Sequence, residues 1–330
     1  MKKYHVYGIG NALVDMEFEV DDAFFETYGI DKGLMTLVDE QRQHELMNHL
    51  DAFEGRKACG GSAANTIMAV SSFGGRGFYS CKVSADELGD FYIDDLKAAG
   101  VDTQLGSQRE EGITGKCLVM VTPDAERTMN TFLGITETFS RAELDVNALK
   151  ESEYLYMEGY LVTSPSGRTA AIEAREIAQQ SGVKTALTFS DPAMVEFFRD
   201  GLGEMLGSGV NLLFCNEMEA KNWAGTDDLA EAVRSLKTVA DEFAITLGSK
   251  GALVYDGQHE IEISPHPIKA LDSNGAGDMF AGAFLYGITH GHSHYEAGNI
   301  ASLAAARVVS QFGPRLARDE HREILELVLS

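Results

Sequence analysis

Short apolar runs alternate with longer stretches of helical periodicity through most of the chain. The apolar runs predict β-strands at Val6–Ile9, Gly77–Val83, Tyr154–Met157, Val183–Phe189, Val210–Cys215 and Phe243–Leu247. Between them, apolar residues that recur every three to four positions predict helices at Ser62–Phe73, Asp86–Ala99, Arg168–Gln180 and Leu229–Ala240. Strands that alternate with helices are typical of βαβ units, so we expect an α/β fold around a mostly parallel sheet.

Two regions break this rhythm. Met16–Val20 and Gly33–Val38 alternate apolar and polar residues, and Lys116–Val121 and Arg127–Phe132 flank a turn at Pro123–Ala125 like the arms of a hairpin. These segments, within about 14–40 and 112–134, predict a small half-exposed antiparallel sheet. It is either a lid that excludes water from a site or an extension of the main sheet edge. We treat residues 1–330 as one domain with a discontinuous lid.

The C-terminal region completes the pattern. Ala252–Tyr255 and Glu260–Ile263 predict a second hairpin, and helices are expected at Ala276–His290 and at Tyr295–Phe312, which closes the fold.

Composition excludes several classes of partner. The 330 residues carry a formal net charge of −24, which weighs against nucleic acid and against an anionic membrane surface. The four cysteines are scattered and suggest neither a zinc site nor a disulfide framework. The N-terminal residues include no apolar region long enough for a signal peptide, and no apolar run reaches 18 residues, so we expect an unprocessed chain in the cytoplasm.

A glycine-rich turn at residues 272–277 leads into an apolar helix and places Asp278 in its first turn. Asn274, Gly275, Ala276 and Gly277 are small or tolerate positive φ, so their N–H groups can converge where the helix dipole is positive. Such a pocket binds phosphate, and Asp278 leans back over it. This predicts phosphoryl transfer, with Asp278 accepting a hydroxyl proton. Alone, such a motif more often marks a loop whose acid only complements the dipole.

A second glycine turn, Gly60-Gly61-Ser62-Ala63-Ala64-Asn65, opens another helix. Paired glycines let a ligand approach the backbone, and the Asn65 amide both donates and accepts hydrogen bonds, which suits a polyhydroxylated substrate. The alternative is a turn capped by Ser62, with Asn65 as a core amide.

The segment from Gly8 to Asp15 follows the first strand. Leu13 stands where a dinucleotide fingerprint has its third glycine, and no acid follows at the distance needed for a ribose, so a dehydrogenase is disfavoured. Asn11 and Asp15 instead offer hydrogen bonds at the carboxyl end of a strand.

Two further motifs follow buried strands. Asn216 and Glu219 are three residues apart, so they share a helix face that can hold Mg²⁺ or can simply cap the helix. Residues 246–251, from Thr246 to Gly251, form a glycine-flanked turn that can pass close to a nucleotide. Neither this turn nor Gly115-Lys116 fits a Walker loop.

In this order, the motifs at 60–65, 216–219, 246–251 and 272–278 resemble those of the ribokinase-like (PfkB) carbohydrate and nucleoside kinases, over nearly the whole chain. Residues 10–15, Asn274 and Arg127 are most similar to those of adenosine kinases. The resemblance implies a ribokinase-like three-layer sandwich with a small β-sheet lid.

The resemblance also implies a role for each site residue. Asp278 is the catalytic base, Gly275, Ala276 and Gly277 form the anion hole, and Arg127 acts on the transferred charge. The substrate is held by Asn11, Asp15, Gly60, Gly61, Ser62 and Asn65, while Phe18, Phe132 and Tyr160 are candidates for stacking on a base, with core packing as the alternative for each. ATP is held by Asn216, Thr246, Gly248, Gly251, Asn274 and Asn299, and Mg²⁺ by Asn216 and Glu219.

We therefore expect an ATP- and Mg²⁺-dependent kinase that phosphorylates a primary hydroxyl, with the 5′-hydroxyl of adenosine as the leading acceptor. A sugar kinase acting on ribose or fructose is the alternative, and a non-catalytic nucleoside- or sugar-binding protein is a third. The resemblance further implies a K⁺ site near the anion-hole loop, and it leaves monomer and homodimer open.

Overall fold

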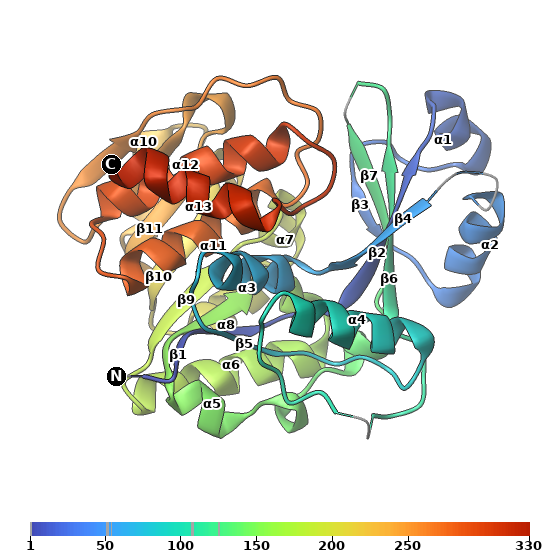
Figure 1. The fold of residues 1–330 in the computed structure, drawn as a ribbon, viewed down its shortest axis with the longest axis horizontal. Helices are drawn as coiled ribbons and strands as arrows, with labels where there is room; N and C mark the ends of the chain where they lie inside the picture. The colour runs from blue at the N-terminus through green and yellow to red at the C-terminus, as the bar shows by residue number, and fades with distance from the viewer. Residues whose placement is uncertain (1, 51–52, 54, 107–108, 125) are drawn as a thin grey trace.

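The computed structural model describes residues 2–50, 53, 55–106, 109–124 and 126–330. Ala125, in the predicted hairpin turn, lies outside the described residues. Within the described part, an eight-stranded sheet runs through the main body in the order β13-β12-β11-β10-β9-β8-β1-β5 (Figure 1). Its strands are β1 (Tyr4–Ile9), β5 (Gly77–Ser80), β8 (Ser152–Glu158), β9 (Lys184–Thr188), β10 (Val210–Asn216), β11 (Ala240–Thr246), β12 (Ala252–Tyr255) and β13 (Glu260–Ile263). The neighbouring strands β5, β1, β8, β9, β10 and β11 run parallel to one another. Strands β12 and β13 form an antiparallel edge, as predicted.

Helices cover both faces of this sheet. One face carries α3 (Ser62–Ser72), α4 (Glu87–Ala98), α11 (Ala276–Thr289), α12 (His294–Val309) and α13 (Arg318–Leu329). The other carries α5 (Val146–Lys150), α6 (Pro165–Gln180), α7 (Pro192–Phe197), α8 (Arg199–Leu206), α9 (Glu217–Ala224) and α10 (Leu229–Leu236). On β8, Tyr154 and Tyr156 enter one core while Leu155 and Met157 enter the other. A strand buried on both faces has to be apolar throughout, which explains the continuous runs in the sequence.

Several element boundaries differ from the prediction. Helix α10 ends at Leu236 because Ala240 already begins β11, and α12 ends at Val309 rather than Phe312. Helix α13 was not predicted, because its sequence, Arg318-Asp-Glu-His-Arg, opens with a run of polar residues. None of the helices in the described part of the chain is both long and apolar enough to cross a membrane.

A second sheet, which we call the small sheet, stands beside the main body (Figure 1). Its strand order is β3 (Met35–Leu37), β7 (Arg127–Phe132), β6 (Gly115–Val121), β2 (Leu13–Glu19) and β4 (Gly55–Gly60). The pairs β2–β4 and β6–β7 are antiparallel, but β2–β6 and β3–β7 are parallel. The predicted small sheet is therefore present and contains parallel as well as antiparallel pairs, and strand β4 was missed.

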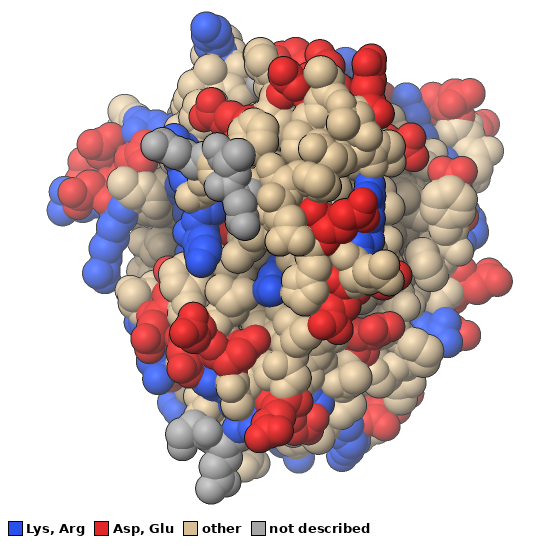
Figure 2. Space-filling view, turned by 90° about the vertical axis from the view of Figure 1, so that its right-hand side faces the viewer, with Lys and Arg blue, Asp and Glu red and all other residues tan. Residues whose placement is uncertain are grey.

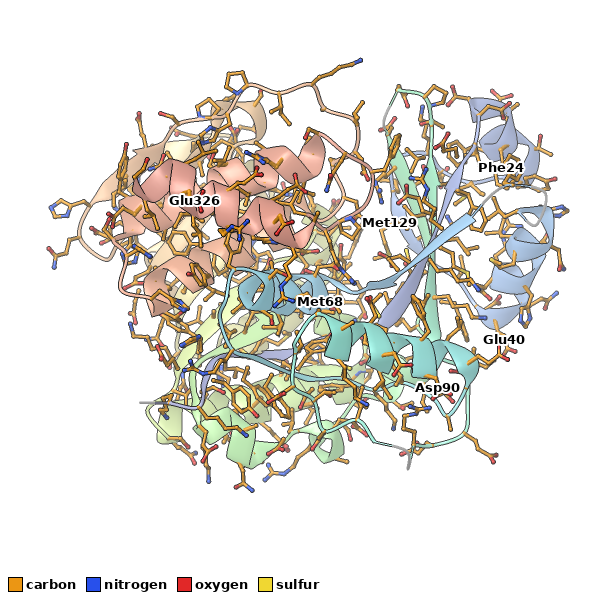
Figure 3. All side chains as sticks on the ribbon, viewed as in Figure 1. Phe24, Glu40, Met68, Asp90, Met129 and Glu326 are labelled. Carbon is orange, nitrogen blue, oxygen red and sulfur yellow. The ribbon has the colours of Figure 1, made fainter. Side chains whose placement is uncertain are left out.

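Two helices that the sequence pattern did not reveal, α1 (Asp22–Tyr28) and α2 (Glu40–Leu50), cover the outer face of the small sheet. Phe24, Leu46 and Leu50 from these helices pack against Met16 and Phe18 of β2. In Figure 3, Phe24 lies on this outer side, and Met129 lies between the small sheet and the main body. The inner face of the small sheet, which these helices do not cover, therefore borders the space between the two sheets.

Helices α3 and α11 cross at close range, and each begins with one of the glycine motifs. A Cβ at Gly282 of α11 would lie 2.6 Å from the carbonyl oxygen of Thr66 and 2.6 Å from the Cβ of Ala69, both on α3. Only glycine permits this approach. The crossing holds the first turns of both helices at one place.

We predict that Gly282→Ala lowers the stability of the protein, by about 1–3 kcal/mol, because the added methyl forces the two helices apart. Gly203→Ala in α8 is the matched control, since a Cβ there meets nothing within 4 Å. In a helix that change is expected to stabilise by up to about 1 kcal/mol. Urea unfolding followed by circular dichroism measures both. A Gly282→Ala midpoint equal to or above that of the wild type would contradict the close crossing.

Candidate active site

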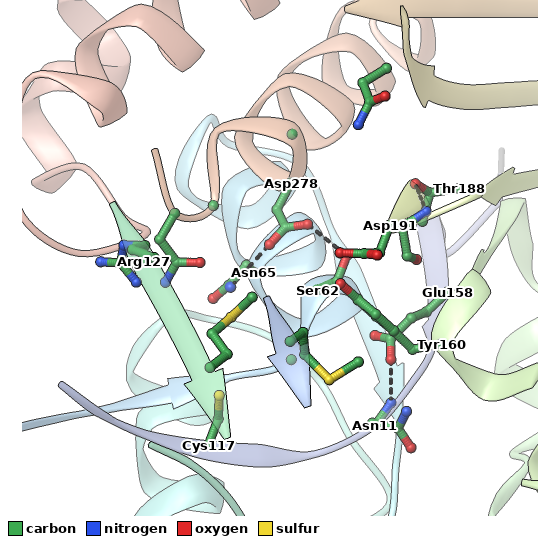
Figure 4. A pocket seen from close by; sticks show the side chains of 18 of the residues that line it. Asn11, Ser62, Asn65, Cys117, Arg127, Glu158, Tyr160, Thr188, Asp191 and Asp278 are labelled. Atoms are coloured by element: carbon green, nitrogen blue, oxygen red, sulfur yellow. Dashed lines mark hydrogen bonds between the residues drawn. The ribbon is translucent and has the colours of Figure 1, made fainter. Parts of the chain in front are cut away.

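A cavity of about 570 Å³ lies between the inner face of the small sheet and the carboxyl ends of the main strands (Figure 4). Residues at or just beyond the ends of β1, β8, β9, β10 and β11 line it: Asn11, Glu158, Thr188, Asn216 and Thr246. The carboxyl edge of a parallel sheet is the usual place for ligands in α/β proteins. Most of the predicted site residues meet in this cavity.

Asp278 stands in the first turn of α11 and faces the first turn of α3. Its Oδ1 accepts a hydrogen bond from Ser62 Oγ at 2.6 Å, and its Oδ2 accepts one from Asn65 Nδ2 at 3.1 Å (Figure 4). Burial raises the pKa of Asp278 to about 6, although both hydrogen bonds favour the charged form. Near neutral pH such a carboxylate is ionised yet remains a capable proton acceptor.

The predicted anion-hole loop lies against the same space. Gly275 precedes α11 with φ of +70°, and Gly275 and Gly277 line the cavity. A hydrogen bond within the loop stabilises it, since the Oδ1 of buried Asp272 accepts a hydrogen bond from Asn274 N at 2.9 Å. The dipole of the 14-residue helix α11 thus opens onto the cavity beside Asp278.

The second glycine motif makes room for an acid. A Cβ at Gly60 would lie 2.0 Å from Oδ1 of Asp15, and Gly61 adopts φ of +94° close to the carbonyl of Asn11. Asp15 lines the cavity, and burial raises its pKa to about 7 even though Arg315 and Arg127 act in the opposite direction. Gly60 therefore makes room for the Asp15 carboxylate, which faces the cavity, and Gly61 makes room for the carbonyl of Asn11.

Glu158 is a site residue that the sequence analysis missed. It is 1% exposed, ends strand β8 and accepts hydrogen bonds from Asn11 N at 3.1 Å and Ala63 N at 2.8 Å. Burial raises its pKa to about 7. It ties the end of β1 to the start of α3. An acid at the end of a buried strand was the only signal for it in the sequence.

Asn216 and Glu219 hold each other in a capping box at the start of α9. Glu219 N donates to Asn216 Oδ1 at 2.8 Å, while Asn216 N and Nδ2 donate to the Glu219 carboxylate at 3.0 and 2.7 Å. The helix-cap interpretation thus describes their local structure. Both still line the cavity, and burial raises the pKa of Glu219 to about 8. A cation beside this carboxylate would offset its burial, so the two residues fit the predicted Mg²⁺ site.

Arg127 reaches the cavity from β7 but is already paired. It binds Asp272 through Nε and Nη2, and its Nη2 lies 3.2 Å from Glu17 Oε2. Its Nη1 is buried and has no hydrogen-bond partner among the residues that the structure describes. Only that nitrogen is free for a phosphate oxygen, so the predicted action on the transferred charge rests on Nη1.

The inner face of the small sheet carries apolar side chains beside Asp15, Arg127 and Thr131, and two of the predicted stacking residues are not on it. Strand alternation places Arg127, Met129 and Thr131 toward the cavity, so Phe132 points to the outer face. Phe18 likewise packs in the outer core against Gly55. Their prediction as base-stacking residues was wrong, whereas Tyr160 does line the cavity. The wall that sequence reasoning missed consists of Leu13, Met35, Leu37, Cys117, Met129 and Leu133.

The remaining predicted ATP contacts divide into two groups. Thr246 and Asn274 line the cavity. Gly248, Gly251 and Asn299 lie outside its lining, and the Asn299 Nδ2 donates to Tyr295 O at 2.7 Å on its own helix. Their contact with ATP remains a prediction. Figure 2 looks onto the outer side of the small sheet, where acidic and basic side chains are interspersed among uncharged ones.

Comparison with known proteins places these features in a family. A sequence profile described as pfkB family carbohydrate kinase matches residues 25–321. Adenosine kinase of Saccharomyces cerevisiae is 26% identical over 330 residues, which cover 93% of this chain and 95% of that protein.

Solved structures agree with the sequence comparisons. A structure of adenosine kinase from Sinorhizobium meliloti is 35% identical with a TM-score of 0.91, covering 97% of this chain and 99% of that one. A probable sugar kinase from Rhizobium etli is 32% identical with a TM-score of 0.92, covering 99% of this chain and 100% of that one. The chain therefore belongs to the PfkB family of carbohydrate kinases, which are phosphotransferases with an alcohol group as acceptor.

Proposed function

We propose that this kinase transfers the γ-phosphate of ATP to the 5′-hydroxyl of adenosine. The observation that carries the choice of acceptor is the chemistry of the cavity wall. Hydrogen-bonding groups suited to a ribose (Asp15 and Asn65) lie on the same cavity as the apolar wall of the small sheet, where Met35 pairs with Met129 in register. A nucleoside presents these two chemistries together, a polyhydroxylated ring and a flat apolar base.

The wall suits a purine without aromatic stacking. Thioether sulfur makes favourable contacts with aromatic rings, worth about 0.3–1.5 kcal/mol each, and methionine adapts its shape to the ring. Tyr160 adds one aromatic side chain to the cavity lining. Similarity to the Sinorhizobium meliloti adenosine kinase supports the same acceptor.

Each part of the transfer that falls to the protein has a candidate residue in the cavity. Asp278 receives the proton of the attacking hydroxyl, and the N-terminus of α11 stabilises negative charge on the transferred phosphoryl group. When bound, Mg²⁺ supplies neutralisation of the ATP phosphates, and Asn216 and Glu219 would hold the ion or its waters. The apolar wall of the small sheet limits the access of water, which would otherwise compete as acceptor.

A sugar kinase is the second candidate, and similarity to the probable sugar kinase from Rhizobium etli supports it. Such an enzyme would use the same base and anion hole. A free pentose would, however, leave the methionine wall uncovered. The K⁺ site implied by the family resemblance remains a prediction in either case.

The first test is ADP release with Mg-ATP against adenosine, inosine, guanosine, cytidine, ribose and fructose, with Asp278→Asn as the paired variant. We expect turnover on adenosine, and a loss in kcat of about 10²–10⁴ in the variant because the proton acceptor is removed. Nucleotide affinity should change little. Turnover on a sugar alone would replace the proposed acceptor, and near wild-type turnover by the variant would overturn the assignment of the base.

A second prediction concerns the base wall. Met129→Ser should raise KM for adenosine about tenfold, because the variant loses about 1.5 kcal/mol of apolar contact with the base. Met129→Leu keeps the apolar area and is the control, with a change of only a few-fold. Steady-state kinetics on adenosine and on ribose measure the effect. A KM for adenosine that Met129→Ser leaves unchanged would mean that the base does not lie on this wall.

A third prediction concerns the metal. Glu219→Gln should raise the Mg²⁺ concentration that gives half-maximal rate by about three- to tenfold, because it removes an anionic ligand. Glu217→Gln, two residues away, is the matched control, since Glu217 is paired with Lys221 and Lys250 on the surface. The measurement is a Mg²⁺ titration of ADP release at saturating ATP and adenosine. Equal titration curves for both variants would exclude Glu219 from the metal site.

A further inference from the structure

The segment 313–315, between α12 and α13, contacts three parts of the candidate active site. Gly313 N donates to Oδ2 of Asp272 at 2.8 Å. Pro314 packs so closely on the anion-hole loop that a Cβ at Gly275 would lie 2.4 Å from its own Cβ. Arg315 extends to the first turn of α3. No motif in the sequence pointed to this segment.

Arg315 uses each nitrogen of its guanidinium for a different partner. Nη1 donates to Asp95 Oδ2 of α4 at 2.7 Å, Nη2 donates to the carbonyl oxygen of Cys59 at the end of β4, and Nε donates to Asn65 Oδ1 at 3.4 Å. Asp95 also accepts a hydrogen bond from Cys59 N at 3.2 Å. When two nitrogens of a planar guanidinium are held by partners, the N–H of its third nitrogen points in a fixed direction.

The third contact determines which end of the Asn65 amide faces the catalytic carboxylate. Asn65 is 5% exposed, and a carboxamide has one accepting and one donating end. Because Oδ1 accepts from Arg315, the NH₂ group is directed to Asp278, where it donates at 3.1 Å. A flipped amide would set oxygen against the Asp278 carboxylate and NH₂ against the guanidinium. Both contacts would be repulsive.

We propose that Arg315 is a positioning residue for phosphoryl transfer: it fixes the Asn65 carboxamide with its donor toward Asp278. It reaches Asp278 through Asn65, and its own anchors are Asp95 and the Cys59 carbonyl. The proposal rests on the roles proposed for Asp278 and Asn65 and goes beyond them, because it assigns a function to a residue outside the cavity lining.

The electrostatic surroundings give the direction of the effect. Hydrogen bonds from Asn65 and Ser62 lower the pKa of Asp278, while burial raises it. The carboxyls of Asp15 and Glu158 and the phenols of Tyr156 and Tyr160 interact electrostatically with Asp278; burial raises the pKa of Asp15, and the charges of Arg315 and Arg127 lower it. With the amide free to rotate, Asp278 loses a donor and its pKa rises. The acid limb of the rate profile then moves to higher pH, because the base must be ionised to act.

The test is a double-mutant cycle of Arg315→Met and Asn65→Ala, assayed as ADP release with Mg-ATP and adenosine from pH 5.5 to 9. Methionine keeps the length of the arginine stem and removes the fork. We expect Arg315→Met to lower kcat/KM about tenfold or more at pH 6, less at pH 9, with its acid limb shifted upward. In the Asn65→Ala background the same change should cost less than about threefold, because the residue through which Arg315 acts is gone.

A pure charge effect or a general loss of packing gives a different result. Either would lower the rate equally in both backgrounds and would overturn the proposal, as would an acid limb that does not move. Arg307→Ala is the matched control: this arginine of α12 pairs with Glu323 at 3.0 Å on the surface, and its removal should leave the profile unchanged.

Two further measurements separate the possible failures. If Arg315→Met does not fold, as judged by circular dichroism, Asp95→Asn loosens the anchor without touching Asn65, and a smaller shift of the acid limb in the same direction is expected; no shift would overturn the proposal. If Asp278→Asn and Asn65→Ala each retain wild-type turnover, the proposed roles of these two residues fail. If both lose turnover while Arg315→Met does not, only the positioning role fails.

Discussion

The close crossing of α3 and α11 is the contact on which the site depends. Each helix begins with a glycine turn at the cavity, and the absence of a side chain at Gly282 lets the two backbones approach until Asp278 receives hydrogen bonds from Ser62 and Asn65. The position of the proposed base is thus set by backbone packing in the core and not by a mobile loop. A rigid placement of this kind is what phosphoryl transfer requires, because the protein contributes mainly orientation and electrostatic stabilisation.

A second constraint is the charge of the cavity. Asp15, Glu158, Glu219 and Asp278 all have pKa values raised by burial, and Arg127, an arginine among the described lining residues, is itself paired with Asp272 and Glu17. In their ionised form these carboxylates repel a bare polyphosphate and attract a cation. Hydroxyl groups of a substrate can satisfy these carboxylates, and a divalent ion beside Glu219 can make triphosphate binding favourable. The acidity of the cavity therefore selects for a hydroxylated acceptor together with metal-bound ATP.

How far the sequence predicted this site depends on where each residue lies. Asp278, Ser62, Asn65 and Asn216 follow turns or strand ends, and local rules for helix starts bring such side chains to the carboxyl edge of a parallel sheet. Glu158 and Arg315 carry no such local signal, because their roles come from contacts distant in sequence: Glu158 with Ala63, and Arg315 with Asn65. Helices α1 and α2 were also missed. Their apolar residues pack in a separate small core against the small sheet, so their role too depends on contacts outside the local sequence.

The wrong predictions for the base-binding wall have one cause: successive side chains of a strand point to opposite faces of the sheet, and the sequence does not say which set faces the cavity. Along β7 the cavity receives Arg127, Met129 and Thr131, so Phe132 must face outward, and on β2 the same rule sends Asp15 inward and Phe18 outward. A shift of one residue would exchange every one of these side chains. The pairing of Arg127 with Asp272 holds Arg127 on the inner side of β7, so Met129 faces the cavity and Phe132, a predicted stacking residue, does not. The amino-acid pattern of these strands does not by itself decide which side chains face the cavity. The register of the small sheet decides it, and with it the acceptor that the cavity wall favours.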